Sequence, residues 1–255
     1  MHLRVLEHDR EDQPQQLPTE LAEKLQIPQG DAATPQSLVS WAVSRFGSRL
    51  VVTTGFGMEG CVLIDMLWRL GLPLTVHYLD THFFFPETHA LRLRLEARYP
   101  GIAIVNAGTD LTPEEQAAAI GPELWKTAPD RCCNIRKVEP MQRLLAGAQA
   151  WMTGLRRSQS DTRADTAFVE QDTRFGVFKI NPLAGWSREN VWDYAVANGV
   201  PYNELHEQGY PTIGCTHCTR PVPGSTVIDY SRAGRWAGID KTECGLHWNS
   251  PGAGI

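Results

Sequence analysis

The chain has 255 residues, of which 42% are hydrophobic, and it carries a formal net charge of −5 at pH 7. That length suits one large α/β domain with an appendage and is ample for a buried core. The negative charge argues against binding of nucleic acid or of an anionic membrane, although a local cluster of Arg and Lys could still hold a small anion.

Short apolar stretches alternate with helical patterns from residue 34 onward. Predicted strands cover residues 50–54, 74–80, 102–107, 150–154 and 175–183. Predicted helices cover residues 34–47, 61–71, 86–99, 130–146 and 187–199, and a further helix begins at residue 112. Three of the six start with the capping residues Thr34, Thr112 and Ser187. This order is typical of the α/β class, with a mostly parallel sheet and helices on both faces.

Three regions of organisation follow from this pattern. Residues 1–33 read as a polar, Gln-rich N-terminal arm, residues 34–222 as the main domain, and residues 223–255 as a mobile C-terminal tail. No segment has the roughly eighteen apolar residues of a membrane helix, and the charged start is unlike a signal peptide. We therefore expect a cytoplasmic protein that binds no membrane, in which the cysteines serve metal or catalytic roles before disulfides.

Four of the six cysteines form two close pairs, Cys132–Cys133 and Cys215-Thr216-His217-Cys218. Adjacent cysteines can face one site only from a helical turn or kink. A single zinc ion prefers two to four residues between paired cysteines, whereas a cluster spreads its thiolates more widely. The pairs favour an iron–sulfur cluster, with a zinc site or a structural role as the alternatives.

Cys244 lies apart from the two pairs, in the segment Lys241-Thr242-Glu243-Cys244-Gly245-Leu246-His247. A nearby lysine and histidine would lower the pKa of its thiol, which is typical of a nucleophile. The alternative is an idle cysteine in the tail. Cys61 lies in an apolar helical stretch and is expected to be a small buried hydrophobic residue.

Basic residues cluster where ligands of parallel sheets bind, beyond the carboxyl ends of the strands. The segment Gly-Leu-Arg-Arg-Ser-Gln-Ser-Asp-Thr-Arg contains Arg156, Arg157 and Arg163, and the tail adds Arg232 and Arg235. Arginine binds phosphate and sulfate with two parallel hydrogen bonds, so these residues favour anion recognition over an ordinary basic loop. The glycine-bearing turn at residues 54–60 could cradle a phosphate at a helix start, but by itself it is a weak signal.

Taken together, these segments resemble the assimilatory sulfonucleotide reductases, and among them the cluster-bearing adenosine 5′-phosphosulfate reductases. The resemblance covers roughly residues 35–248, and it rests on TTGFGMEG, LDTHFFFPET, CCNIRKVEP, WMTGLRRSQSDTRA, NPLAGWSRENVW, GYPTIGCTHCTRP, RAGRW and KTECGLH. It implies an adenine-nucleotide α-hydrolase-like fold and a [4Fe–4S] cluster on Cys132, Cys133, Cys215 and Cys218.

The resemblance also implies roles for individual residues. Cys244 would be the nucleophile, Lys137 would lie between cluster and substrate, and His247 would help to hold the phosphosulfate. The substrate site would comprise Thr53, Thr54, Gly55, Gly57, Leu79, Asp80, Thr81, Arg156, Arg157, Arg163, Arg232 and Arg235. The chain departs from the family at His82, where a glycine usually follows Leu-Asp-Thr, and at Ala237–Gly238, which replace aromatic residues.

The implied reaction is reduction of adenosine 5′-phosphosulfate to sulfite and AMP, with thioredoxin or a glutaredoxin-like dithiol as the reductant. Reduction of the 3′-phosphorylated nucleotide is the nearest alternative. A further alternative is an ATP-dependent adenylating or thiolating enzyme of the same fold. This sequence lacks the SGGxDS-type loop expected of such an enzyme, which argues against that alternative. A cluster- or zinc-bearing sensor without catalysis is the alternative from another class, and the sequence leaves a homo-oligomer open.

Overall fold

Seven strands form one sheet in the order β1-β6-β7-β5-β2-β3-β4. The computed structural model describes residues 15–247. The strands are β1 (Gln15–Gln16), β2 (Leu50–Thr54), β3 (Leu74–Tyr78), β4 (Ile102–Asn106), β5 (Ala150–Met152), β6 (Val169–Asp172) and β7 (Val177–Ile180). The five strands from β7 to β4 pair in parallel, whereas β6 and β1 add antiparallel pairs at one edge. The predicted mostly parallel α/β sheet is confirmed.

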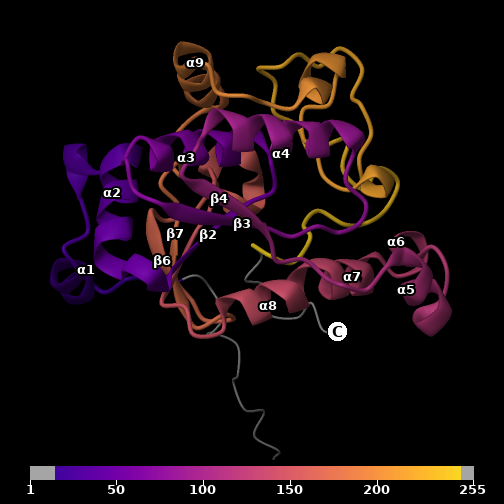
Figure 1. Ribbon diagram of the computed structural model, residues 1–255, viewed down its shortest axis with the longest axis horizontal. Coiled ribbons are helices and arrows are strands. Elements are labelled where there is room, and N and C mark those ends of the chain that lie inside the picture. Colours follow the sequence, from indigo (N-terminus) through magenta and orange to yellow (C-terminus); the bar gives the residue numbers. More distant parts are fainter. Residues whose placement is uncertain (1–14, 248–255) are drawn as a thin grey trace, which may run out of the picture.

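Helices cover both faces of this sheet. They are α1 (Thr19–Leu25), α2 (Pro35–Phe46), α3 (Met58–Trp68), α4 (Pro86–Arg98), α5 (Pro113–Ile120), α6 (Leu124–Thr127), α7 (Pro129–Cys133), α8 (Glu139–Leu145) and α9 (Arg188–Asn198). Figure 1 shows α3 and α4 on one side of the sheet and the consecutive helices α7 and α8 on the other. The largest core cluster joins α2, α3 and α4 to the strands, with Leu63, Leu67 and Val76 almost fully buried.

Local capping signals explain where three helices begin. The Thr34 hydroxyl accepts a hydrogen bond from the Ser37 N–H at 3.2 Å, and Pro35 follows it at the first helical position. Thr112 forms the predicted capping box with Glu115, and Ser187 caps α9 in the same way with Asn190. These side chains satisfy backbone N–H groups that have no partner within the helix.

The helix predicted at residues 130–146 is present, but it changes its winding. The α7 helix ends at Cys133 and runs into a π-helical turn (Asn134–Val138), from which α8 continues to Leu145. π-Helical turns of this kind are rare and occur frequently at functional sites. The two adjacent cysteines therefore lie in the helical turn that their common site requires.

The N-terminal and C-terminal regions differ in regularity. Within the arm expected at residues 1–33, β1 pairs with β6 and α1 buries Leu25, while residues 1–14 lie outside the described part. From residue 223 to residue 247 the described chain has neither helix nor strand, and its one bridge joins Arg235 to Thr219. Among residues 15–247, no helix combines the length and the apolar character needed to cross a membrane.

Candidate active site

The four paired cysteines line one pocket, together with Trp125 of α6 and Pro129 of α7. Cys132, Cys133 and Cys215 are buried, and Cys218 is half-buried. Burial raises the pKa of the Cys132 thiol to about 11 and that of Cys133 to about 12. The structure thus brings together two pairs that are more than eighty residues apart in the sequence.

Backbone and side-chain contacts hold the second pair against the strand ends. The N–H of Thr216 donates to the Phe83 carbonyl at 2.8 Å, and the Thr81 hydroxyl lies 3.3 Å from the Cys215 sulfur. The tail closes the other side, because the Trp236 N–H donates to the Cys218 carbonyl at 3.1 Å. The loop that carries Cys215 and Cys218 is therefore fixed between the main domain and the tail.

Aromatic side chains cover the cysteine pocket. The ring of Trp125 stacks on His217 at 3.9 Å, and Phe83 meets both rings edge-on. The Arg136 guanidinium lies over Phe83 at 4.5 Å and donates to the Thr81 carbonyl at 2.9 Å. Arg136 is 1% exposed, so it does not belong to a solvated helix face.

The donor set of this pocket consists of four cysteine thiols, Cys132, Cys133, Cys215 and Cys218. Among the residues described, no group of three or more His, Cys, Asp or Glu side chains is placed to hold one metal ion. A single zinc ion draws its thiolates to about 2.3 Å from one point, whereas a cluster spreads four thiolates around its own volume. The four thiols line the pocket together, and the cluster that the resemblance implies for them stays a prediction.

Lys137 follows the adjacent cysteines by one helical turn and lines the same pocket. Burial alone would lower the pKa of its ammonium, but the neighbouring thiols raise that pKa above its ordinary value. These thiols are Cys215, Cys133 and Cys244. The charge of Lys137 is therefore coupled both to the four-cysteine pocket and to the cysteine of the tail, and the position between cluster and substrate that the resemblance implies for it stays a prediction.

Cys244 lies in the docked tail, next to Lys137. Burial raises the pKa of its thiol, but the Lys137 ammonium and a hydrogen bond from the Leu246 backbone bring the net pKa below its ordinary value. A thiolate in such a setting is the reactive form of cysteine. Cys61, by contrast, is fully buried in α3, and burial raises the pKa of its thiol to about 12.

Several contacts hold the tail segment in place. Lys241 forms an ion pair with Asp130 of α7, and the Arg174 guanidinium donates to the Gly245 carbonyl. His247 stacks on Trp151 with ring centroids 5.3 Å apart and planes 14° apart. Burial and the surrounding cations hold the pKa of His247 well below its ordinary value, so its imidazole is neutral at pH 7.

Arg235 and Arg232 reach the site from the tail, on opposite sides of Gly234. The Nε of Arg235 donates to the Cys218 carbonyl at 3.3 Å, and its guanidinium lies over Trp236 at 4.4 Å. Arg232 forms an ion pair with Glu243. The same carboxylate pairs with Arg163, so Arg163 and Arg232 come together although they are 69 residues apart in sequence.

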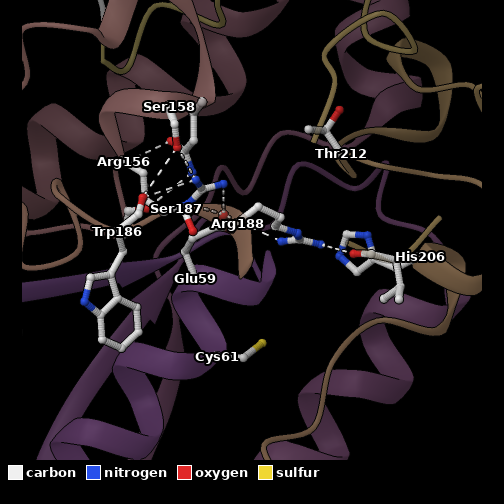
Figure 2. Close-up of polar contacts among 12 residues, drawn as sticks. Glu59, Cys61, Arg156, Ser158, Trp186, Ser187, Arg188, His206 and Thr212 are labelled. Carbon is white, nitrogen blue, oxygen red and sulfur yellow. Dashed lines mark hydrogen bonds and ion pairs between the residues drawn. The ribbon is translucent and has the colours of Figure 1, made fainter. Parts of the chain in front are cut away.

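Arg156 lies in a buried polar network, which Figure 2 shows in close-up. Its guanidinium is fully buried and contacts the Glu59 carboxylate at 2.8–2.9 Å. Arg188 of α9 approaches the same carboxylate at 3.7 Å and donates to the Val227 carbonyl at 3.0 Å. This network connects the start of α3, the loop after β5 and Val227 near the beginning of the tail.

Arg157 has a different environment from Arg156. Its side chain is exposed, donates to the Thr166 carbonyl at 2.8 Å and lies over Phe168 at 5.0 Å. The role in substrate binding that the sequence suggests for Arg157 therefore stays a prediction.

The glycine-bearing turn follows β2 and leads into α3. Thr53 accepts a hydrogen bond from the Trp151 indole at 2.7 Å, and the Thr54 hydroxyl accepts one from the Phe56 N–H at 2.9 Å. Gly55 is exposed, and Gly57 is the cap residue of α3. Free N–H groups at such a helix start are suited to an anion.

Leu79, Asp80 and Thr81 follow β3 at the same edge of the sheet. His82, which stands where the family usually has glycine, has a φ of +58°, a left-handed conformation that glycine adopts without strain. Its N–H donates to the Asp80 carboxylate at 2.8 Å, which stabilises this turn. The departure at position 82 thus keeps the backbone geometry of a glycine.

Sequence reasoning missed the acidic partners of this site. Glu243 and Glu59 are single carboxylates that each pair with two arginines. It also missed the aromatic cover of Trp125 and His217. The stacking of these rings joins α6 to the segment of Cys215 and Cys218, and no local pattern indicates it.

Comparisons with known proteins agree with this geometry. The family described as "Phosphoadenosine phosphosulfate reductase domain" matches residues 49–221. A protein of Lysinibacillus sphaericus named adenosine 5′-phosphosulfate reductase is 45% identical over 82% of this chain and 89% of its own length. One of Shouchella clausii with the same name is 48% identical, over 82% of this chain and 86% of its own.

Solved structures show the same fold. A phosphoadenylyl-sulfate reductase of Candida auris, solved with phosphate, is 34% identical with a TM-score of 0.67, and the match covers 82% of this chain and all of that one. An FMN adenylyltransferase of Candida glabrata matches with a TM-score of 0.54 at 16% identity, over 79% of this chain and 69% of its own, which supports the adenine-nucleotide α-hydrolase-like fold alone. With a family match over most of the chain and relatives above 40% identity, the chain belongs to the phosphoadenosine phosphosulfate reductase family.

Proposed function

We propose that this protein reduces adenosine 5′-phosphosulfate to sulfite and AMP in sulfate assimilation, with Cys244 as the nucleophile. The observation that carries the proposal is the packing of the Cys244 segment against the turn that carries Lys137, where a Cβ on Gly245 would lie 3.6 Å from the Val138 side chain, with arginines on the neighbouring loops. The relatives at 42–48% identity bear the name of this activity, which favours the simpler nucleotide over its 3′-phosphorylated form.

In the first step, the Cys244 thiolate attacks the sulfur of the sulfo group. An S–S bond forms, the bond between sulfur and the phosphate oxygen breaks, and AMP leaves with that bond's electron pair. The enzyme then carries Cys244–S–SO₃⁻. Two anions meet in this step, and the positive charges of Lys137 and the arginines offset their repulsion. One well-placed donor lowers the free energy of the transition state by about 3–4 kcal/mol.

In the second step, a thiolate of thioredoxin or of a glutaredoxin-like dithiol attacks the Cys244 sulfur. Sulfite leaves with the electron pair of the S–S bond. The second thiol of the reductant then resolves the mixed disulfide, which restores the Cys244 thiol and leaves the reductant oxidised. The neutral imidazole of His247 can donate a hydrogen bond to a bound anion without adding a charge.

Cys132, Cys133, Cys215 and Cys218 would hold the [4Fe–4S] cluster, which would supply electrostatic tuning and structural support. What supports this assignment is the convergence of four thiols on one pocket, with a cation at its edge.

Sulfite release tests the proposed function directly. Anaerobically purified protein should release sulfite from adenosine 5′-phosphosulfate with thioredoxin, at a higher kcat/KM than from the 3′-phosphorylated nucleotide. Equal or reversed values would favour the alternative substrate. No release from either nucleotide would favour the non-catalytic sensor.

A further inference from the structure

Five hydrogen-bond donors converge on the carboxylate of Glu243. Arg163 binds both of its oxygens, with Nε 2.9 Å from Oε1 and Nη2 2.8 Å from Oε2. Arg232 Nη2 lies 3.3 Å from Oε2. The hydroxyls of Ser160 and Thr162 lie 3.5 and 3.4 Å from Oε1. We call these four donor residues the oxyanion cradle, because two-oxygen binding by arginine suits sulfate and phosphate as well as carboxylate.

The cradle is partly buried and carries an excess of positive charge: Thr162 is exposed, and Ser160 and Arg232 are half-buried. Arg163 is 8% exposed and Glu243 is 3% exposed. Two guanidinium groups face one carboxylate, so the cradle keeps a net positive charge with Glu243 in place and gains another when it leaves. A buried, uncompensated cation is costly, which favours a ligand with more negative charge than one carboxylate.

The cradle lies where a nucleotide's anionic group would have to be for the proposed reaction. Arg163 is in the loop after β5, at the carboxyl edge of the parallel strands. Glu243 directly precedes Cys244 in the chain. His247 stacks on Trp151, whose indole donates to Thr53 beside the glycine-bearing turn. The tail therefore places the Glu243 carboxylate and the His247 ring near the strand ends. A nucleotide has the same two features, an anionic group and a flat aromatic base.

We propose that Glu243 is an internal occupant of the oxyanion cradle, and that the sulfo or phosphate group of the nucleotide takes the cradle when Glu243 leaves. The proposal rests on the proposed function only for the identity of the nucleotide. Both oxygens of Glu243 already engage the arginines, so a second oxyanion cannot bind to the same N–H groups. Binding of the anion and docking of Glu243 exclude each other.

Because anion binding and docking of Glu243 exclude each other, anion binding also affects the position of Cys244, the proposed nucleophile. Because Cys244 is the next residue, any movement of Glu243 out of the cradle moves the Cys244 backbone as well. With Glu243 in the cradle, the Cys244 side chain is half-buried. The internal carboxylate also weakens the apparent affinity for the anion, since the intrinsic Kd is divided by the fraction of chains whose cradle is free.

Calorimetric titration of the full chain with AMP, and separately with inorganic sulfate, tests the proposal. Glu243→Gln keeps the shape of the side chain and removes its charge, so the Kd for AMP should fall by about tenfold. The matched control is Asp161→Asn, which makes the same change of charge in the loop that carries Ser160, Thr162 and Arg163. Asp161 is exposed, and its carboxylate has no hydrogen bond or ion pair among residues 15–247. Its Kd values should equal those of the wild type.

The two ligands distinguish the sources of the oxyanion. Tighter binding of both shows that the cradle takes a free tetrahedral anion, and tighter binding of AMP alone shows that it needs the nucleotide; either result supports internal occupancy. Unchanged or weaker binding of both ligands overturns the proposal, because Glu243 would then only position the arginines. Equal tightening in Asp161→Asn also overturns it, because bulk charge would explain the effect.

A second measurement keeps the proposal testable if Glu243→Gln does not fold. Amide hydrogen exchange of the wild-type peptide 239–247 is compared in sodium sulfate and in sodium chloride of equal ionic strength. Sulfate should accelerate exchange there by displacing Glu243; unchanged or slower exchange contradicts the proposal. Neither measurement uses turnover, so a failure of the proposed function would appear separately, as absent sulfite release.

Discussion

The guanidinium of Arg235 passes directly over the backbone of Gly214. A Cβ at position 214 would lie 2.6 Å from three atoms of that guanidinium, closer than real contacts allow. Arg235 in turn donates to the Cys218 carbonyl at 3.3 Å. The absence of a side chain at position 214 therefore lets an arginine of the tail reach the loop of the four-cysteine pocket.

Gly214→Ala should displace Arg235 and lower kcat/KM for adenosine 5′-phosphosulfate by about 10²-fold, the effect of losing one charged donor. Arg235→Ala alone should cost a similar factor. The double variant should be no worse than Arg235→Ala, because both changes remove the same interaction. Additive losses in the double variant would mean that Gly214 acts through something other than Arg235.

Lys137→Ala should lower kcat by about 10²-fold or more and should shift the reactivity of Cys244. The ammonium stabilises the thiolate and lowers its pKa, so its removal raises that pKa. The rate of Cys244 alkylation, followed against pH, should therefore rise at a higher pH in the variant than in the wild type. Arg131→Ala, which removes an exposed cation from the same helix, should leave both the rate and the pH profile unchanged.

The carboxylate of Glu59 should stabilise the fold in a pH-dependent way. Burial raises its pKa, but Arg156 and Arg188 lower it more, so the folded-state pKa is below the ordinary value. In the unfolded chain a glutamate titrates at about 4.3, so this stabilisation is complete above that pH. It is lost as the pH falls through the lower folded-state pKa.

Glu59→Gln should therefore reduce the free energy of unfolding by about 3–5 kcal/mol at about pH 7, because it leaves buried guanidinium groups without a counterion. The difference from the wild type should shrink when urea unfolding is repeated below about pH 4. Glu23→Gln, at an exposed position of α1, is the isosteric control. It should change neither the free energy of unfolding at about pH 7 nor its dependence on pH. A pH-independent difference would assign the loss to packing.

Local signals in the sequence predicted most of the fold. Thr34, Thr112 and Ser187 cap helices through hydrogen bonds to residues three positions away, so the sequence contains both partners within one turn. The strands β1 and β6 were missed because their sequences, QQ and VEQD, are polar and give no apolar strand pattern. Their pairing depends on the neighbouring strand and not on their own pattern.

The site was predictable where residue type and spacing both carried information. The cysteine pairs have a metal-ligand spacing, and the structure brings them to one pocket. Glu243 and Glu59 have no such spacing, because a single glutamate in a sequence has no feature that distinguishes a buried carboxylate from a solvated one. Their partners Arg163 and Arg156 lie 80 and 97 residues away. Only the fold shows that these charges are buried together.

Trp125→Ala should make the iron–sulfur chromophore more sensitive to air. The indole stacks on His217 and covers the pocket of the four cysteines, so its removal opens a path for solvent and oxygen. Absorbance near about 400 nm should decay faster in air, while anaerobic iron content stays at about four atoms per chain. Trp192→Ala, in the aromatic pair with Tyr202 on the main core, should decay at the wild-type rate. Colourless anaerobic protein with one zinc ion would contradict the cluster assignment itself.

Cys244 should be the residue that carries the sulfo group. Incubation with adenosine 5′-phosphosulfate and no reductant should add about 80 Da, the mass of SO₃, to the peptide that contains Cys244, and thioredoxin should remove it as sulfite. Cys244→Ser should abolish both the adduct and turnover while the absorbance near about 400 nm stays intact, because the proposed cluster ligands are Cys132, Cys133, Cys215 and Cys218. Cys61→Ala is the matched control. Its thiol is fully buried, and burial raises its pKa to about 12, so it is neither accessible nor ionised at neutral pH. The control should form the adduct at the wild-type rate. Peptide mass spectrometry decides between the two cysteines: an adduct on Cys61, or sulfite release by Cys244→Ser, would falsify the assignment of the nucleophile.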